Sequence, residues 1–282
     1  DGTLWVQDHG HRAIIGISPD GGEVARHPMM VLGFAYMWNA VLDDHGRIWQ
    51  EWGHSELRSG PPEPGMREGS SRRYLKSYDP EIGSYDSVSV GEVTTRSYTV
   101  SIGEGYALFG PPFQPGTLTA VDPAGGFWIA WTGRYRVARL DQSGDTVLVV
   151  DVAAEGPPIT SADRDGLAAR YQRLGEAQAN RVASAMLEFL PERKPVLEQI
   201  FVDEGSRLWV RRALPVGERI VYDVFDAEGE HIVSVRPTFR PSTYFRPVIR
   251  EGSLFTLVAD ELDVPFVVRA PLPFVDRPLP LP

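Results

Sequence analysis

The sequence predicts an all-β fold built from repeats, and two observations carry that prediction. First, a turn containing glycine is followed by an apolar residue and a tryptophan in "DGTLWV", "DDHGRIWQ", "PAGGFWIA" and "DEGSRLWV". The tryptophans are Trp5, Trp49, Trp128 and Trp209, and Phe255 of "EGSLFTLV" marks a fifth copy. Second, successive markers lie 44, 79, 81 and 46 residues apart, so the long spacings are close to twice the short ones.

Further strand patterns surround each marker. An apolar stretch that ends in a turn precedes it, as in "LEQIFVDEG", and a strand that ends in an Asp or Ser turn with glycine follows it, as in "IVYDVFDAEG". Such turns are typical of hairpins. A last strand follows in "TVLVVDVA" and "HIVSVRP". Four antiparallel strands with a period of roughly 40 to 50 residues predict a β-propeller of four-stranded blades. Five blades are legible, and we expect six.

The tryptophan has a structural role in this fold. Each blade is a twisted sheet whose faces pack on the neighbouring blades, so a large flat residue in the second strand fills the space between sheets. The glycine before it permits the tight turn between the first two strands. We therefore interpret the four tryptophans as packing residues and not as ligand-stacking residues.

We expect residues 1–282 to form a single propeller domain that is trimmed at its N-terminus. The first copy begins at its second strand and the last copy stops after its third, so one short upstream segment would complete both. The Pro-rich tail 274–282 is not expected to close the ring, because proline cannot donate to a strand ladder. The chain begins at Asp1 with no basic and then apolar leader, and we expect either that a leader was removed or that upstream sequence is missing.

Two segments depart from the regular blade. Residues 94–110 are typical of a single hairpin, either an eroded blade or an elaboration of its neighbour. Residues 160–190 predict a helical insertion between blades, opened by Thr160 and Asp163 at capping-box spacing. Two apolar stripes are expected on either side of a break at Gly175, namely Leu167, Tyr171 and Leu174, then Val182, Met186 and Phe189.

The strand "D-x-G-x-[LI]-W-V" followed by "R-x-x-x-x-D-x-x-G" resembles the NHL-like and TolB-like six-bladed β-propellers of bacteria. The chain is most similar to secreted propellers in which a late blade reads like "LWVRR…YDVFDAEG" and the end like "DELDVPFVVRA". The resemblance covers Asp1 to about Ala270 and implies a secreted or periplasmic protein. It implies no activity, because propellers host unrelated functions.

Composition excludes several classes of function. A net charge of −10 argues against nucleic-acid binding, which needs clustered Lys and Arg. The absence of cysteine excludes disulfides, thiolate metal sites and a cysteine nucleophile. No apolar run approaches the roughly 18 residues of a membrane span. We expect a monomer.

The candidate site is one mouth of the central channel. Loops between the second and third strands of the blades are expected there, at 7–12, 51–71, 131–134, 211–219 and 259–265. The helical insertion and "RPTFRPSTYFRP" fall on the same side, which predicts a cap over that mouth.

The capped mouth gathers histidines and carboxylates, with His9, His11, Glu51 and His54 as candidate catalytic residues. Such groups could act as acid and base or bind a divalent metal. "HGH" and "EWGH" are not recognised ligand spacings, so solvated loop residues are the favoured interpretation. No metal site and no cofactor are predicted, and a divalent metal is kept as the alternative.

Two enzyme families on this fold can be compared with the sequence. Gluconolactonase-like propellers hold calcium with a carboxylate and asparagines, but the chain has only Asn39 and Asn180, so this family is disfavoured. Streptogramin-lyase-like propellers use histidine and glutamate, which the candidate residues imitate loosely. No G-x-S-x-G elbow of a serine hydrolase occurs.

Three hypotheses follow. The first is a non-enzymatic propeller that binds a small molecule or a protein at the capped face. Its candidate contacts are Trp52, Trp131, Arg211, Arg212, Asp260 and Glu261. The second is a hydrolase or lyase that uses the histidine and carboxylate cluster, which requires at least two of those groups within hydrogen-bond reach around a pocket. The third is a structural module of a larger secreted protein.

Overall fold

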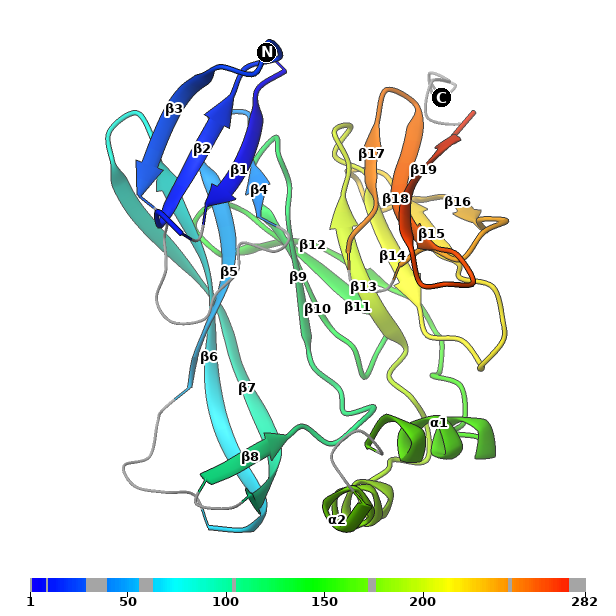
Figure 1. Ribbon diagram of the computed structural model, residues 1–282. Coiled ribbons are helices and arrows are strands. Elements are labelled where there is room, and N and C mark those ends of the chain that lie inside the picture. Colours follow the sequence, from blue (N-terminus) through cyan, green and yellow to red (C-terminus); the bar gives the residue numbers. More distant parts are fainter. Residues whose placement is uncertain are drawn as a thin grey trace.

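The computed structural model describes residues 2–8, 10–28, 40–55, 63–102, 105–171, 176–242 and 245–273. Within these residues the chain forms five antiparallel sheets and two helices (Figure 1). Strands are joined to their sequence neighbours in every sheet, so each sheet is a simple meander.

The strands of the five sheets follow in chain order. The first sheet contains β1 (Leu4–Asp8), β2 (Ala13–Ile17) and β3 (Glu23–Pro28). The second contains β4 (Val41–Leu42), β5 (Ile48–Ser55), β6 (Gly65–Asp79), β7 (Ser84–Ile102) and β8 (Gly105–Phe109). The third contains β9 (Thr117–Val121), β10 (Phe127–Trp131), β11 (Arg136–Leu140) and β12 (Thr146–Asp151). The fourth contains β13 (Leu197–Val202), β14 (Leu208–Arg212), β15 (Tyr222–Phe225) and β16 (His231–Val235). The fifth contains β17 (Val248–Arg250), β18 (Ser253–Ala259) and β19 (Pro265–Pro271).

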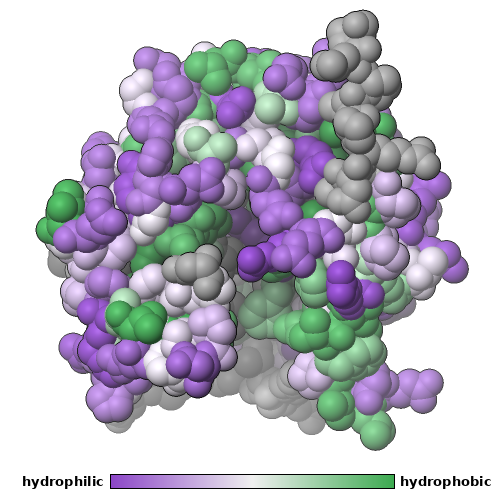
Figure 2. Space-filling view, turned by 90° about the horizontal axis from the view of Figure 1, so that it is seen from above, coloured by the Kyte–Doolittle hydropathy of each residue, from purple (hydrophilic) through white to green (hydrophobic). Residues whose placement is uncertain are grey.

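Consecutive sheets pack face to face, which is the arrangement of a β-propeller. Four apolar clusters each join one sheet to the next, from the first and second sheets to the fourth and fifth. Viewed from the side opposite the helices, the molecule is hollowed near its centre, and both hydrophilic and hydrophobic residues border the opening (Figure 2). The predicted fold class is confirmed. A sixth blade stays a prediction.

The marker tryptophans fill the spaces between sheets, as predicted. Trp128 and Trp209 have 0% exposed surface. Trp49 meets Phe127 of the third sheet edge to face, with ring centroids 4.8 Å apart. Trp5 is half-buried and packs on His27 of its own sheet at 5.7 Å. The wedge is therefore fully developed in the second, third and fourth sheets.

Two of these tryptophans are held by a local arrangement that we call the Asp-Arg-Trp clasp. In the fourth sheet, Asp203 Oδ2 accepts hydrogen bonds from Trp209 Nε1 at 2.9 Å and from Arg207 Nε at 2.8 Å. Its Oδ1 accepts the backbone N–H of Gly205 and of Arg207. One buried carboxylate therefore binds the backbone of the turn, the Arg207 guanidinium and the Trp209 indole.

The second sheet repeats the clasp with the same spacing. Asp43 Oδ2 lies 2.8 Å from both Trp49 Nε1 and Arg47 Nε. The Arg47 guanidinium also lies over the indole, 5.2 Å from the ring centroid, in a cation–π contact.

The third sheet has the aspartate but not the clasp. Trp128 Nε1 has no hydrogen-bond partner among the described residues. Glycine stands at position 126, where the second and fourth sheets have arginine. Asp122 pairs instead with Arg139 Nη2 at 3.1 Å and accepts the hydroxyl of Ser206, from the fourth sheet, at 2.8 Å.

The second sheet contradicts the loop that we expected at 51–71. Residues 48–55 and 65–79 are strands, and β6 and β7 pair over their whole length. The hairpin predicted at 94–110 is the far end of this pair together with β8, so it elaborates the second blade. The distal part, residues 65–73 and 91–102, leaves the body of the sheet (Figure 1) and is called the hairpin arm below.

The helical insertion consists of α1 (Ser161–Tyr171) and α2 (Glu176–Glu188). Thr160 and Asp163 cap α1 as predicted, since Asp163 Oδ2 accepts the Thr160 backbone N–H at 2.9 Å. Leu167, Tyr171, Val182 and Met186 are buried against the arm, in a cluster with Val100, Tyr98 and Phe109. Phe189 lies just beyond the end of α2 and is 36% exposed, so the second apolar stripe that we expected does not extend to it. Leu174 and Gly175 lie outside the described residues.

A buried ion pair attaches α1 to the strands. Asp163 Oδ1 lies 2.6 Å from Lys194 Nζ, and both side chains are buried. Burial alone raises the pKa of Asp163, but hydrogen bonds from Lys194 and Thr160 outweigh that effect, so the pKa lies below its ordinary value of 3.8. A carboxyl group whose pKa is lower in the folded state stabilises the fold at pH values above its unfolded-state pKa. This stabilisation is lost as the pH falls through the folded-state pKa.

We expect Asp163→Asn to be less stable than the parent protein at pH 7 and its stability to depend less on pH. The difference between the two proteins should shrink below about pH 4, as Asp163 itself becomes protonated. Urea unfolding midpoints at pH 7, 5, 4 and 3 measure this. Asp165→Asn, an exposed change on the same helix, is the control, and an identical pH profile for both variants would contradict the role of the pair.

Candidate functional site

The loops at one end of the sheets lie on the same side of the molecule as the helices, which agrees with the cap that the sequence predicts. The β10–β11 and β14–β15 connections point toward the end of the molecule where α1 and α2 lie (Figure 1). Lys194, which follows the insertion, also donates to the carbonyl of Leu214 in the β14–β15 connection at 3.4 Å. The insertion is therefore tied to a loop of this capped face.

The described members of the histidine and carboxylate cluster have different partners. His11 is exposed on the β1–β2 turn, where its Nδ1 lies 2.7 Å from Asp8 Oδ2. Glu51 lies within β5 and contacts Thr119 and Arg73. His9 lies outside the described residues, and His54 belongs to the backbone of β5 but its side chain is not described. The catalytic role of His9 and His54 therefore stays a prediction.

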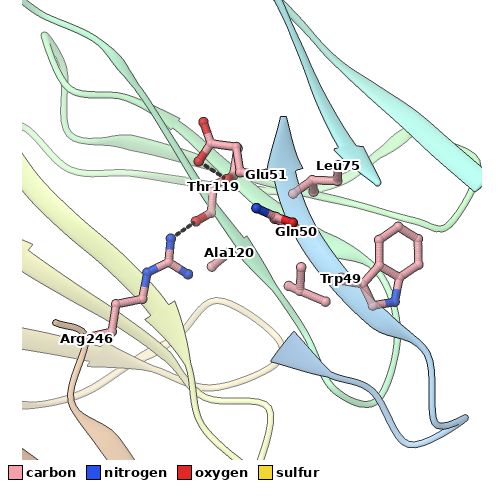
Figure 3. Close-up of a pocket in the computed structure, with 8 residues that line it drawn as sticks. Trp49, Gln50, Glu51, Leu75, Thr119, Ala120 and Arg246 are labelled. Carbon is pink, nitrogen blue, oxygen red and sulfur yellow. Dashed lines mark hydrogen bonds between the residues drawn. The ribbon is translucent and has the colours of Figure 1, made fainter. Parts of the chain in front are cut away.

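Glu51 lies instead in what we call the inner pocket, lined by Trp49, Gln50, Glu51, Leu75, Thr119, Ala120, Val121 and Arg246 (Figure 3). The Thr119 hydroxyl donates to Glu51 Oε2 at 2.9 Å. Arg246 Nη2 donates to the Thr119 carbonyl at 3.0 Å. Three segments distant in sequence therefore meet at the first strand of the third sheet.

The inner pocket is a polar network with little free space. Its volume is about 50 Å³, room for roughly three water molecules. Burial lowers the pKa of Arg246, and the nearby charge of Glu51 partly opposes that shift. Arg73 Nη1 lies 3.4 Å from Glu51 Oε1. Glu51 is already bound by Thr119 and Arg73 and the free volume is small, so this network joins sheets more readily than it binds a ligand.

A larger cavity, of about 350 Å³, lies on the capped face. Its charged lining residues come from the start of the fourth sheet, the β14–β15 connection and the segment after β16: Lys194, Glu198, Arg212, Glu218, Arg219 and Arg240. Four cations face two carboxylates in a protein whose net charge is −10. We call this cavity the basic pocket.

The cations of the basic pocket are held in different ways. Lys194 is paired with Asp163. Arg212 Nε lies 3.1 Å from Asp223 Oδ2. Arg219 and Arg240 are exposed, and neither forms an ion pair with the residues that the structure describes. Two guanidinium groups are therefore available to a ligand.

Asp223, the partner of Arg212, is itself held by two hydroxyl groups. Asp223 accepts the hydroxyls of Tyr135 at 2.8 Å and Ser234 at 2.6 Å. Burial, followed by the charge of Asp223 and the hydrogen bond to it, raises the pKa of Tyr135. The phenol therefore stays a hydrogen-bond donor to Asp223 at ordinary pH.

The other predicted contacts are dispersed. Arg211 is buried, does not line the basic pocket, and lies 3.1 Å from Glu198 through its Nε. Asp260 caps the β18–β19 turn by accepting the backbone N–H of Leu262 and Val264. Glu261 is exposed on that turn. The side chain of Trp52 lies outside the described part of the chain.

Trp131 lines a separate cavity of about 320 Å³ between the hairpin arm and the third sheet. We call it the Trp131 cleft. Its lining includes Val90, Glu92 and Val93 of β7, and Ala130, Trp131, Arg134 and Arg136 of the third sheet. Trp131 is 43% exposed, so this tryptophan, unlike Trp128, does not serve as a wedge.

No set of three metal-ligating side chains converges in the part of the chain that the structure describes. Across the same residues, no helix is both long and apolar enough to cross a membrane.

Sequence reasoning missed Lys194, Arg219 and Arg240, because the pocket combines segments that are far apart along the chain. The sequence carries part of the signal: it predicts that the segments 211–219 and 236–247 both lie on the capped face, and the second of them, "RPTFRPSTYFRP", contains three arginines.

Comparison with known proteins gives structural likenesses only. No protein-family profile matches the chain. None of the curated proteins matches it in sequence. A member of the DUF4221 family from Bacteroides vulgatus is 10% identical with a TM-score of 0.41, over 91% of this chain and 69% of that one. A streptogramin B lyase is 11% identical with a TM-score of 0.32, over 91% and 87%. A calcium-binding protein, regucalcin, from Agrobacterium tumefaciens is 14% identical with a TM-score of 0.30, over 92% and 79%. At these values the likeness says nothing of ligand or reaction, and the fold assignment rests on the chain's own sheets.

Proposed function

We propose that this β-propeller is a binding protein that takes an amphiphilic organic anion into the basic pocket. The observation that carries the proposal is the pair Arg219 and Arg240, which line a cavity of about 350 Å³ and have no ion pair among the described residues. Cavities of roughly 300 to 1,000 Å³ are typical of small-molecule sites.

The charge of the pocket supports an anionic ligand. Arginine offers a planar fork of donors that matches a carboxylate or phosphate. The charge of Arg212 is balanced by Asp223, so the positive potential of the pocket comes from Arg219 and Arg240, which contact the ligand. A local excess of cations in an acidic protein favours a small anion, because a large polyanion would be repelled by the remaining surface.

The walls of the pocket support an apolar body on that anion. Leu214, Val216, Ile220 and Phe239 line it together with Pro215, and Val216 is exposed. Apolar walls with a few placed polar groups are the usual composition of ligand pockets. Most of these walls are aliphatic, so the proposed ligand has an aliphatic chain beside its charged group.

Octanoate is therefore expected to bind, and octanol, which has the same chain without the charge, is expected to bind at least about tenfold more weakly. The double variant Arg219→Ala/Arg240→Ala should lose about tenfold or more in affinity for octanoate. Isothermal titration calorimetry measures both dissociation constants.

The matched control is Arg72→Ala, which removes an exposed arginine that lines neither the basic pocket nor the Trp131 cleft. It should bind octanoate as the parent protein does. Equal affinity for octanoate and octanol, or an unchanged affinity in the double variant, would contradict the proposal.

A further inference from the structure

The Trp131 cleft exists because the second blade is bent at one point. Across β6 and β7, Arg73 pairs with Gly91 while Tyr74 pairs with Ser89, so Val90 is an extra residue in β7. This is a β-bulge, which bends the strand that carries it. Gly91 has φ +113°, a conformation that favours glycine.

The bulge marks the boundary between the packed interface of the second and third sheets and the open Trp131 cleft. Val90 is buried in the apolar cluster between the second and third sheets, with Trp49 and Phe127. Beyond it, Glu92 and Val93 of the arm face Ala130 and Trp131 across the cleft. The arm has turned away from the third sheet at this point, and the space between them is unfilled. Bulges are frequent beside functional sites, where they re-aim strands.

The cleft has an apolar floor and a charged rim. Val90, Val93 and Ala130 are buried at its base, whereas Trp131 and Arg134 are exposed at its edge. A dry centre surrounded by polar groups is the composition of a recognition site, and tryptophan and arginine are the residue types that carry most binding energy.

The indole is held ready by the turn beside it. A Cβ at Gly133 would lie 2.8 Å from Trp131 Nε1, so only glycine lets the ring lie against the turn. The turn is closed by a hydrogen bond from the Arg134 N–H to the Trp131 carbonyl at 3.1 Å. A rigid aromatic surface binds at a low entropy cost.

Two arginines flank the indole with donors to spare. Arg134 Nη2 and Arg136 Nη1 lie 3.8 Å and 3.6 Å from the same carboxylate oxygen of Asp151, distances at which no hydrogen bond forms. Both guanidinium groups are exposed. They can therefore turn toward a negatively charged group on a ligand in the cleft.

We propose that the Trp131 cleft is a second binding site, specific for a planar aromatic ring that carries a carboxylate. The ring stacks on Trp131 above the apolar floor, and the carboxylate is bound by Arg134 and Arg136. The proposal is independent of the basic pocket, because the two cavities share no lining residue.

The test compares 2-naphthoate with decahydro-2-naphthoate, which has the same charge and a puckered, saturated ring system. The parent protein should bind 2-naphthoate about tenfold more tightly than its saturated analogue, measured by calorimetry. Trp131→Ala should lose about tenfold in affinity for 2-naphthoate, and Trp131→Phe should recover part of it.

Two further variants test position and charge. Gly133→Ala displaces the indole without removing it and should weaken binding of the aromatic probe. Arg134→Gln/Arg136→Gln should weaken binding of both probes equally, because both carry the carboxylate. Circular dichroism and urea unfolding confirm that each variant is folded, as expected for exposed side chains.

The basic-pocket variant Arg219→Ala/Arg240→Ala distinguishes the two proposals, because it should lose octanoate binding and keep 2-naphthoate binding. Loss of 2-naphthoate binding in that variant, with Trp131→Ala unaffected, would overturn the cleft proposal. Equal affinity of the parent protein for the two naphthoates, or no binding of either, would overturn it as well.

Discussion

Trp209→Ala is expected to lower the free energy of unfolding by about 3 to 5 kcal/mol, the usual range for deleting a buried aromatic side chain. Trp209 is fully buried. Its ring stacks on Phe201 at 5.6 Å and meets Tyr222 at 6.2 Å. It belongs to the cluster that joins the fourth sheet to Ile249 and Leu254 of the fifth. Alanine would leave a cavity between two blades. Urea unfolding followed by circular dichroism measures the loss.

Trp131→Ala is the matched control for this prediction. The residue type and the substitution are the same, and the side chain lies at the end of a second strand, but 43% of its surface is exposed. Trp131→Ala should lower the free energy of unfolding by about 1 kcal/mol or less. If both variants lost the same amount, the assignment of Trp209 as an inter-blade wedge would be wrong.

Asp203→Ala is expected to lower the free energy of unfolding by about 3 kcal/mol, because it removes a fully buried carboxylate that binds a partly buried arginine and a buried indole. Arg207 would lose its carboxylate, and the indole N–H of Trp209 would lose its acceptor. Two backbone N–H groups of the turn would also lose theirs. The same urea titration measures the change.

Asp226→Ala separates the clasp from the turn. Asp226 accepts two backbone N–H groups at the β15–β16 turn, from Glu228 and Glu230, as Asp203 does in its own turn. Asp226 forms no ion pair and accepts no indole N–H among the described residues. Its removal should cost about 1 kcal/mol. A loss as small for Asp203→Ala would show that the clasp adds nothing to an ordinary turn.

The repeat predicted the propeller because sheet packing imposes one requirement on every blade. A wedge between sheets needs a large flat side chain at one point of the second strand, so the tryptophan recurs with the period of the blade. The clasp could also have been found, since an aspartate lies six residues before Trp49, Trp128 and Trp209.

The hairpin arm could not be predicted from local composition. The stretch "GMREGSSRR" in β6 has few residues of high strand propensity, and it is a strand because β7 pairs with it residue by residue. Strand propensity depends on the partner more than on the segment itself. The two proposed sites were hidden for a related reason: each is formed by segments that meet only after the blades have packed.

The turns before the marker tryptophans are closed by different contacts, and this difference also sets the order in which the blades can fold. In the second and fourth sheets each clasp is closed within seven consecutive residues, 43–49 and 203–209, so contacts of short sequence separation complete it. The corresponding aspartate of the third sheet is completed by Ser206, 84 residues away. Amide hydrogen exchange should therefore divide the protein into unequal cooperative units. The turns at 43–49 and 203–209 would be protected by clasps closed within themselves, whereas the turn at 122–128 has local backbone hydrogen bonds but gains the Ser206 contact only once the fourth sheet has docked.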